Sequence, residues 1–123
     1  MRALIIDDSK AIRTVLSRIL AEIGFETFEA GNGADALLVL RQNGAMDLAL
    51  VDWNMPGMSG LELVQIIRAD RAYDEMRLMM ATTETGMSQM SFALAAGANE
   101  YIMKPFTKEM MADKLALLGI ERH

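Results

Sequence analysis

Charged and hydroxyl side chains stand directly after short, mostly apolar runs of this sequence. They are Asp7 and Asp8 after 3–6, Asp52 after 48–51, Thr82 after 78–81, and Lys104 after 100–103. If these runs are parallel strands of one sheet, their carboxyl ends converge on one edge, where ligand sites of such sheets lie. The sequence therefore predicts a cluster of carboxylates, a lysine and a hydroxyl at one edge.

Three carboxylates brought together repel one another. Two unit charges about 4 Å apart cost on the order of 4 kcal/mol at an effective dielectric constant near 20. A hard divalent cation offsets this repulsion, and Mg²⁺ favours one or a few carboxylates with waters and phosphate oxygens. With Lys104 as a positive charge and the Thr82 hydroxyl as a donor, the set suits in-line phosphoryl transfer to a carboxylate. We expect Mg²⁺ as the cofactor.

Asp52 is the expected nucleophile because it stands alone at the middle strand. Asp7 and Asp8 are adjacent, which suits metal ligation together with Asp52. The backbone carbonyl of Asn54 is a further candidate metal ligand. Pro56 and the glycines after it prevent an immediate helix, so we expect Asp52 to be presented at a rim.

Simpler interpretations exist for each of these residues taken alone. Asp7-Asp8 suits a turn with a helix cap, and Lys104-Pro105 suits a strand end. Either Thr82 or Thr83 can end its strand on local grounds. Met-x-x-Met pairs at 55/58 and 87/90 have no cysteine or histidine to support a soft-metal site, so core filling is the default for methionines of the strands.

The apolar spacing predicts five strand-then-helix units. Strands are expected at 3–6, 25–30, 48–52, 78–81 and 100–103, and helices at 12–23, 32–43, 61–67, 86–96 and 107–118. Asn32 and Thr107 are expected helix caps, and Ile12 and Val15 belong to the repeating apolar set of the first helix. Strict alternation implies parallel strands with right-handed crossovers, hence a doubly wound α/β sheet with helices on both faces. The mixed segment 25–30 is typical of an edge strand.

Composition restricts the function classes. The length of 123 residues fits one domain over 1–123 with no effector domain. There is no cysteine, and the only histidine is the last residue, which nearly excludes histidine acid–base chemistry. Scattered bases and a net charge of -5 argue against nucleic acid. No apolar run approaches membrane-spanning length, so we expect a cytoplasmic protein without membrane insertion.

The chain resembles the receiver domain of bacterial two-component response regulators, most of all the stand-alone chemotaxis type. The resemblance covers the whole chain, and it is carried by Asp7-Asp8, the run 52–57 (Asp-Trp-Asn-Met-Pro-Gly), Thr82, Tyr101 and the run 104–106 (Lys-Pro-Phe). It implies a flavodoxin-like sheet of five strands in the order 2-1-3-4-5 with five helices. It also implies roles for the residues: Asp52 as phosphoacceptor, Asp7 and Asp8 serving Mg²⁺, Thr82 and Tyr101 as the switch pair, and Lys104 contacting the phosphoryl group before a cis bond to Pro105.

The resemblance implies a monomeric signalling protein and not an enzyme. A histidine kinase would donate the phosphoryl group, and the output would be a protein target such as a flagellar motor switch component or a downstream signalling protein. The domain would assist its own Mg²⁺-dependent phosphorylation and dephosphorylation. A phosphorelay intermediate or a phosphate sink of the same family stays open. Thr83 departs from the family's usual alanine or glycine, which leaves the dephosphorylation rate open.

We expect a partner face on the fourth helix, fifth strand and fifth helix. Its candidate residues are Met87, Met90, Tyr101 and Phe106. At 100° per residue, Phe92 lies well round the helix from Met90 and Leu94, so both sides cannot face the core. Exposed methionine surface suits adaptable protein binding.

Two functions of other classes share parts of the pattern. A phosphohydrolase of the haloacid-dehalogenase type also uses an aspartate nucleophile at a strand end with Mg²⁺, but it needs a second carboxylate two residues later. This chain has Asn54 there. A flavin carrier of similar fold needs a hydroxyl-rich phosphate loop after the first strand, where this chain places two acids.

Overall fold

The computed structural model describes residues 1–83 and 87–120, with the side chains of all of these except 87 and 88. The strands are β1 (Arg2–Ile6), β2 (Glu26–Ala30), β3 (Leu48–Asp52), β4 (Arg77–Thr82) and β5 (Glu100–Met103). They form one parallel sheet in the order β2-β1-β3-β4-β5. The predicted sheet and strand order are confirmed, and the segment predicted as an edge strand, β2, lies at one border.

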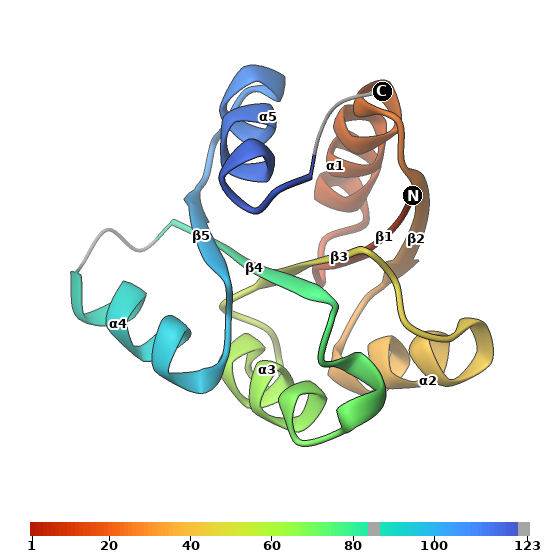
Figure 1. The fold of residues 1–123 in the computed structure, drawn as a ribbon, viewed down its shortest axis with the longest axis vertical. Helices are drawn as coiled ribbons and strands as arrows, with labels where there is room; N and C mark the ends of the chain where they lie inside the picture. The colour runs from red at the N-terminus through yellow and green to blue at the C-terminus, as the bar shows by residue number, and fades with distance from the viewer. Residues whose placement is uncertain (84–86, 121–123) are drawn as a thin grey trace.

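The helices cover both faces of this sheet. They are α1 (Lys10–Ile23), α2 (Gly33–Asn43), α3 (Gly60–Arg68), α4 (Met87–Ala96) and α5 (Lys108–Leu117), with a short 3-10 turn, η1 (Arg71–Tyr73), before β4. Figure 1 shows α1 and α5 on one face and α2, α3 and α4 on the other. The start predicted for the fourth helix, residue 86, lies outside the described residues. Over the described ranges, no helix combines the length and apolar character needed to cross a membrane.

Alternating strand residues fill two apolar layers. Leu4, Ile6 and Val51 are buried toward α2 and α3, whereas Ile5 and Leu50 are buried toward α1 and α5. This two-sided burial explains why the central strands are continuous apolar runs. Full burial of one such side chain stabilises the fold by about 1.5–3 kcal/mol, so the sheet is a rigid base for groups at its carboxyl edge.

Capping residues start the helices close to that edge. The side chains of Ser9, Asn32, Ser59 and Thr107 accept hydrogen bonds from the first turns of α1, α2, α3 and α5. The caps predicted at Asn32 and Thr107 are confirmed. Because three of these caps follow a strand by only a few residues, the helix starts hold the connecting loops beside the strand ends.

The repeating apolar set of the first helix is only partly buried. Ile12 and Val15 of α1 are 39% and 54% exposed, whereas Leu16, Leu20 and Ile23 are buried. The first turns of α1 lie beside the segment after β5, and Ile12 and Val15 line a groove of about 330 Å³ there. Helical periodicity identifies an apolar stripe, but it does not say how much of the stripe the sheet covers.

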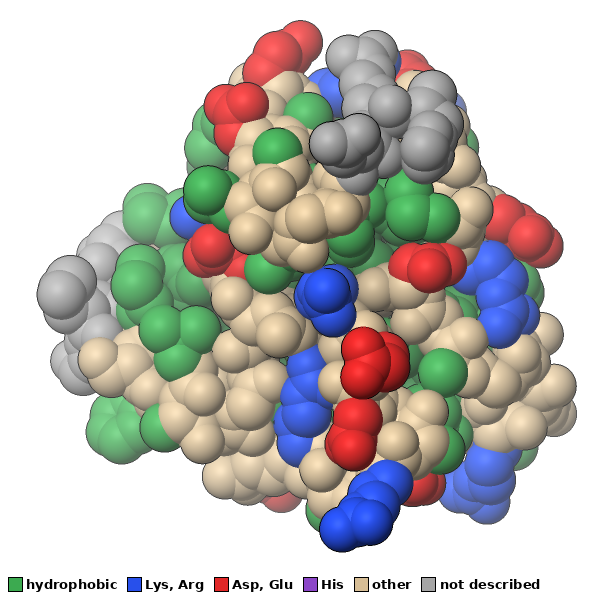
Figure 2. Space-filling view, in the orientation of Figure 1, with side chains coloured by type: hydrophobic (Ala, Val, Ile, Leu, Met, Phe, Trp, Pro, Cys, Tyr) green, Lys and Arg blue, Asp and Glu red, His purple; other side chains and the backbone are tan. Residues whose placement is uncertain are grey.

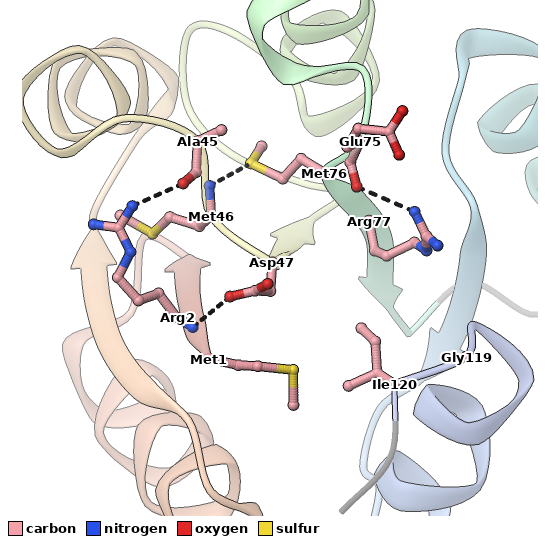
Figure 3. Close-up of a pocket in the computed structure, with 10 residues that line it drawn as sticks. All are labelled: Met1, Arg2, Ala45, Met46, Asp47, Glu75, Met76, Arg77, Gly119 and Ile120. Atoms are coloured by element: carbon pink, nitrogen blue, oxygen red, sulfur yellow. Dashed lines mark hydrogen bonds between the residues drawn. The ribbon is translucent and has the colours of Figure 1, made fainter.

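A cavity of about 730 Å³ lies at the opposite edge of the sheet, lined by the starts of β1 and β4 and the segment before β3. Arg2 donates from its guanidinium to the carbonyl of Ala45 at 2.8 Å, and Arg77 donates to the carbonyl of Glu75 at 3.1 Å. Figure 3 shows both arginines turned to backbone groups of the lining. These contacts support the loops at that edge, and the cavity lies far from the acidic cluster.

Candidate functional site

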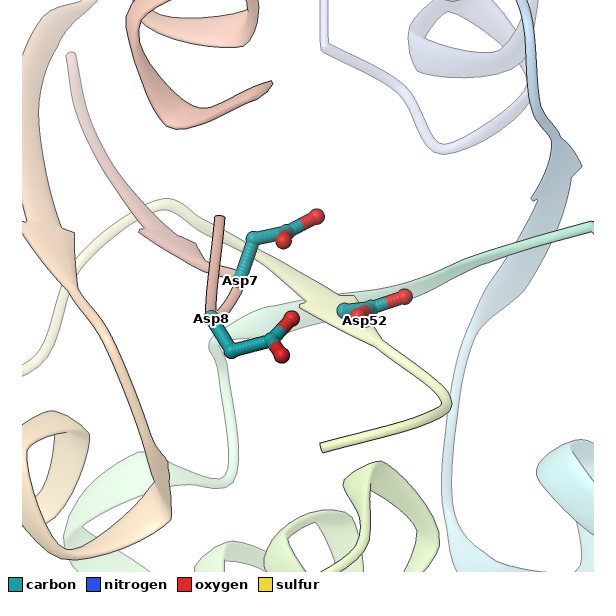
Figure 4. Close-up of side chains that lie close together, drawn as sticks. All are labelled: Asp7, Asp8 and Asp52. Carbon is teal, nitrogen blue, oxygen red and sulfur yellow. The ribbon is translucent and has the colours of Figure 1, made fainter. Parts of the chain in front are cut away.

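Three carboxylates meet at the carboxyl edge of the sheet. Asp7 and Asp8 follow β1 and Asp52 ends β3, and these two strands are neighbours in the sheet. One ligand oxygen from each residue lies within 4.8 Å of the others, with Asp7 buried, Asp52 half-buried and Asp8 exposed. Figure 4 shows the three side chains side by side at the strand ends. The structure therefore brings together the predicted acidic cluster.

Lys104 connects two of these carboxylates. Its Nζ lies 2.7 Å from Oδ2 of Asp7 and 3.0 Å from Oδ1 of Asp52. The backbone N–H of Lys104 donates to the carbonyl of Thr82 at 2.8 Å, which fixes the lysine to the end of β4. The Lys104–Pro105 peptide bond is cis, as the resemblance implied. A cation is thus held between Asp7 and Asp52.

The surroundings of the site raise the pKa of both Asp52 and Lys104. Burial raises the pKa of Asp52, and the negative charges of Asp7 and Asp8 add to this, while Lys104 opposes it without cancelling it. For Lys104, burial alone lowers the pKa, but the hydrogen bonds and charges of Asp7 and Asp52 outweigh it and leave the pKa raised. Burial is thus the main reason that the pKa of Asp52 stays raised, and a further cation beside the three carboxylates would lower it.

Gly60 allows α3 to approach the backbone of Asp52. A Cβ at this position would collide with the carbonyl oxygen of Asp52, and the Gly60 N–H donates to the carbonyl of Trp53 at 3.0 Å. The Trp53 N–H in turn donates to the carbonyl of Ala81 in β4 at 3.1 Å. Sequence reasoning treated this glycine only as a helix breaker. The signal for its role is its place directly after the Ser59 cap, where the first turn of α3 meets the strand end.

The residues expected as a switch pair lie on neighbouring strands. Thr82 ends β4 and Tyr101 is in β5, and both side chains are buried. Tyr101 pairs in register with Met80, and Thr82 is two residues further on, so the two side chains share one face of the sheet. Thr83 is exposed and lies outside the strand. Of the two threonines that could end this strand on local grounds, Thr82 is therefore the one that does.

The structure divides the expected partner residues between two surfaces. Met90 and Tyr101 line one depression, whereas Phe106 lines the groove beside α1. The side chain of Met87 lies outside the described residues. The depression, of about 350 Å³, also includes Met103, Met110 and Leu117, which the sequence did not single out for binding. Core filling, the default for the strand methionines, is wrong for Met103, which is 42% exposed on the edge strand β5.

Helix α4 adds exposed apolar surface next to this depression. Phe92 and Leu94 are 60% and 49% exposed, while Ala93 between them is buried. Figure 2 shows hydrophobic side chains gathered on the side of the molecule where α4 and α5 lie. The expectation that α4 cannot bury all its large apolar residues is confirmed.

The residues present fit a hard divalent cation. The three carboxylates offer oxygen ligands within 4.8 Å of one another, and the exposure of Asp8 leaves a side open to water. Mg²⁺ prefers oxygen ligands and keeps several of its waters. Asn54 follows Asp52 by two residues with an exposed side chain, and its carbonyl as a ligand stays a prediction.

A doubly wound sheet of this order with an acidic cluster and a lysine at its carboxyl edge defines the CheY-like receiver class. Residues 3–116 match the family model for the response regulator receiver domain, and the chain belongs to this family. Receiver domains of this kind are signalling proteins that bind Mg²⁺ at an acidic pocket, take phosphate from a histidine kinase and act on protein targets.

Several curated relatives are chemotaxis proteins. The chain is 40% identical over 116 residues to a chemotaxis protein CheY homolog of Campylobacter jejuni, covering 94% of this chain and 89% of that protein. It is 40% identical over 119 residues to chemotaxis protein CheY1 of Helicobacter pylori, covering 96% of each. Among solved structures, chemotaxis response regulator CheY4 of Vibrio cholerae superposes with a TM-score of 0.87 at 33% identity, covering 95% of this chain and 97% of that one.

Proposed function

We propose that Asp52 accepts a phosphoryl group from a histidine kinase and that its phosphorylation switches binding to a protein target. The observation that carries this proposal is the position of Lys104, whose Nζ lies 3.0 Å from Asp52 and 2.7 Å from Asp7. A fixed cation beside a half-buried carboxylate is suited to neutralise the oxygens of an incoming phosphoryl group.

In the transfer, an oxygen of Asp52 bonds to phosphorus while the bond between phosphorus and the donor's imidazole nitrogen breaks. The electron pair of that bond leaves with the imidazole. Lys104 then pairs with phosphoryl oxygens in place of the free carboxylate. Mg²⁺ held by Asp7, Asp8, Asp52 and the Asn54 carbonyl would supply the further positive charge that three carboxylates and a phosphoryl group require.

Dephosphorylation follows the same geometry with water as the attacking group. The residue two after Asp52 is Asn54, whose amide cannot take a proton from this water as a carboxylate can. This favours an acceptor that holds its phosphoryl group over a phosphohydrolase that turns over. Lys104 and the expected Mg²⁺ would assist both the gain and the loss of the phosphoryl group, because they neutralise its oxygens.

The switch we propose couples Asp52 to the partner face. The Thr82 hydroxyl would move to donate to the phosphoryl group, and the Tyr101 ring, on the same face of the sheet, would fill the space it leaves. Phosphorylation then biases an existing equilibrium between two arrangements. The readout surface is the depression of Met90, Tyr101, Met103, Met110 and Leu117 with the exposed residues of α4.

We propose a chemotaxis-type output for this face, because the relatives at 40% identity are chemotaxis proteins. The target would be a flagellar motor switch component or another downstream signalling protein, bound by the receiver domain of a cytoplasmic monomer. A phosphorelay intermediate or phosphate sink remains the second candidate. This second function is favoured if phosphorylation of Asp52 does not change the affinity of the domain for any protein that binds it.

Trp53 provides the test of this proposal because it adjoins Asp52 and is the only tryptophan. We expect its fluorescence to change on addition of Mg²⁺ and again on addition of beryllofluoride, a phosphoryl mimic. Beryllofluoride-treated protein should then capture a target that untreated protein does not. Asp52→Asn should lose the beryllofluoride response, and an unchanged response in that variant would refute the role of Asp52.

A further inference from the structure

Arg13 of α1 reaches across the end of β1 to the edge strand β2. Its Nη1 donates to the backbone carbonyl of Asp7 at 2.6 Å, and its Nε donates to Oε1 of Glu29 at 3.1 Å. The Arg13 side chain is only 16% exposed. The guanidinium therefore contacts the segment that carries two of the three acids without contacting their carboxylates.

The bond to the Asp7 carbonyl bears on Asp8 as well. That carbonyl belongs to the planar peptide unit that joins Asp7 to Asp8, so holding its oxygen also orients the Cα of Asp8. The other groups of Asp7 are held independently: its N–H donates to Ala30, and its carboxylate accepts from the Ser9 N–H at 2.9 Å and from Lys104. Within the hydrogen bonds of the described residues, Arg13 is the side chain that fixes the Asp7–Asp8 peptide plane.

The chain also leaves room for this guanidinium. A Cβ added to Gly31, directly after β2, would lie 3.3 Å from Nη1 of Arg13. Such a contact is tighter than most side chains tolerate, so a larger residue would push the guanidinium away from the carbonyl. On the β2 side, Gly31 thus leaves space for the Arg13 guanidinium, and Glu29 accepts a hydrogen bond from it.

We infer that Arg13 is a positioning residue for the metal site, which sets the Asp7–Asp8 peptide plane so that both carboxylates face the bound cation. This inference rests on the proposed function, in which Asp7 and Asp8 hold Mg²⁺. Residues that orient metal ligands without touching the metal typically contribute 10–100-fold to metal affinity. The effect acts through geometry, since the charge of Arg13 is already paired with Glu29.

The test is a Mg²⁺ titration followed by Trp53 fluorescence in the full chain. Arg13→Ala should weaken the apparent Mg²⁺ affinity by roughly tenfold. Arg13→Lys should recover part of this loss, because an ammonium group still donates to a carbonyl. Glu29→Gln is the matched control: it removes the ion pair, leaves the bond to Asp7, and should stay within about twofold of wild type.

A second readout separates positioning from a general structural role. At saturating Mg²⁺, the rate of labelling by acetyl phosphate in Arg13→Ala should return close to that of wild type. A Mg²⁺ affinity within twofold of wild type, or a labelling rate that stays low at saturating Mg²⁺, would overturn the inference. If Arg13→Ala does not fold, Arg13→Gln and Arg13→Lys carry the same comparison. Absence of any Mg²⁺ response in the wild type would instead refute the proposed function itself.

Discussion

At the level of single residues, the site is organised by one cation shared between two carboxylates. Lys104 is the partner of both Asp7 and Asp52, yet burial and the neighbouring acids still keep the pKa of Asp52 raised. A further positive charge would therefore stabilise the ionised form of Asp52. A centre that receives a divalent cation and then a phosphoryl group is expected to have this property.

The raised pKa of Asp52 predicts how stability depends on pH without metal. The folded state binds this proton more tightly than the unfolded chain, whose ordinary value is 3.8. The contribution of Asp52 is thus fully present below that value and is lost as pH rises through the folded pKa. Asp52→Asn does not titrate, so the variant should gain stability relative to wild type as the pH rises above the ordinary value of 3.8.

Urea unfolding in chelator over this pH range measures the difference between the two proteins. A difference that is constant with pH, or that shrinks toward neutral pH, would contradict the raised pKa.

Of the three acids, Asp8 can be substituted with the least disturbance of the fold, because it is exposed. Asp8→Asn should raise the melting temperature of the metal-free protein by a few degrees, since it relieves repulsion with Asp7 and Asp52. Thermal unfolding in chelator measures the change. Asp113→Asn, at an exposed aspartate of α5, is the control and should not raise it. A lower melting temperature for Asp8→Asn would count against the clustered-acid argument.

At the level of elements, Arg68 joins four segments on the face of the sheet that α3 and α4 cover. From the end of α3, its guanidinium donates to the carbonyl of Gly97 at 2.8 Å, the carbonyl of Met76 at 2.7 Å and Oδ1 of Asn99 at 2.6 Å. Burial lowers the pKa of this arginine. The contacts attach the end of α4 and the starts of β4 and β5 to α3.

Arg68→Ala should reduce the free energy of unfolding by about 2–3 kcal/mol, because several carbonyls lose a charged donor at once. Arg71→Ala is the matched control, since Arg71 is exposed, and should change stability by less than about 0.5 kcal/mol. Denaturant unfolding of both variants measures the effect. Equal decreases in the free energy of unfolding of the two variants would show that the contacts of Arg68 do not stabilise the fold.

The sequence predicted the elements well because each signal was local. Continuous apolar runs specified buried strands, and Asn32 and Thr107 specified helix starts. The expected residues at strand ends met because parallel order brings those ends to one edge. Contacts between distant segments were not predictable: no local pattern shows that Arg13 reaches the carbonyl of Asp7, or that Phe106 turns to α1 instead of toward Met90.

At the level of the whole molecule, the proposed phosphoacceptor site and the proposed readout surface occupy different parts of one sheet. The acids lie at the carboxyl edge, and the apolar depression lies over β5 beside α4 and α5. The cavity at the opposite edge is lined by arginines that bind backbone carbonyls. The proposed switch runs from Thr82 to the depression through Tyr101, and both residues lie on the α4 side of the sheet.

Mg²⁺ should stabilise the entire fold, because the three acids meet only in the folded chain. At a concentration 100 times the dissociation constant, binding adds about 2.7 kcal/mol to the free energy of unfolding. Thermal unfolding in Mg²⁺ and in chelator, at matched ionic strength, measures this gain. Asp7→Asn should reduce it, and an equal gain in that variant would place the cation elsewhere.

The most direct test of the central claim is incubation with acetyl phosphate and Mg²⁺, followed by intact-mass measurement. Wild type should gain one phosphoryl group, and Asp52→Asn should gain none, while Asp47→Asn, an acid at the opposite edge, should be labelled like wild type. No added phosphoryl group in wild type, or labelling that persists in Asp52→Asn, would contradict the assignment of Asp52 as the phosphoacceptor.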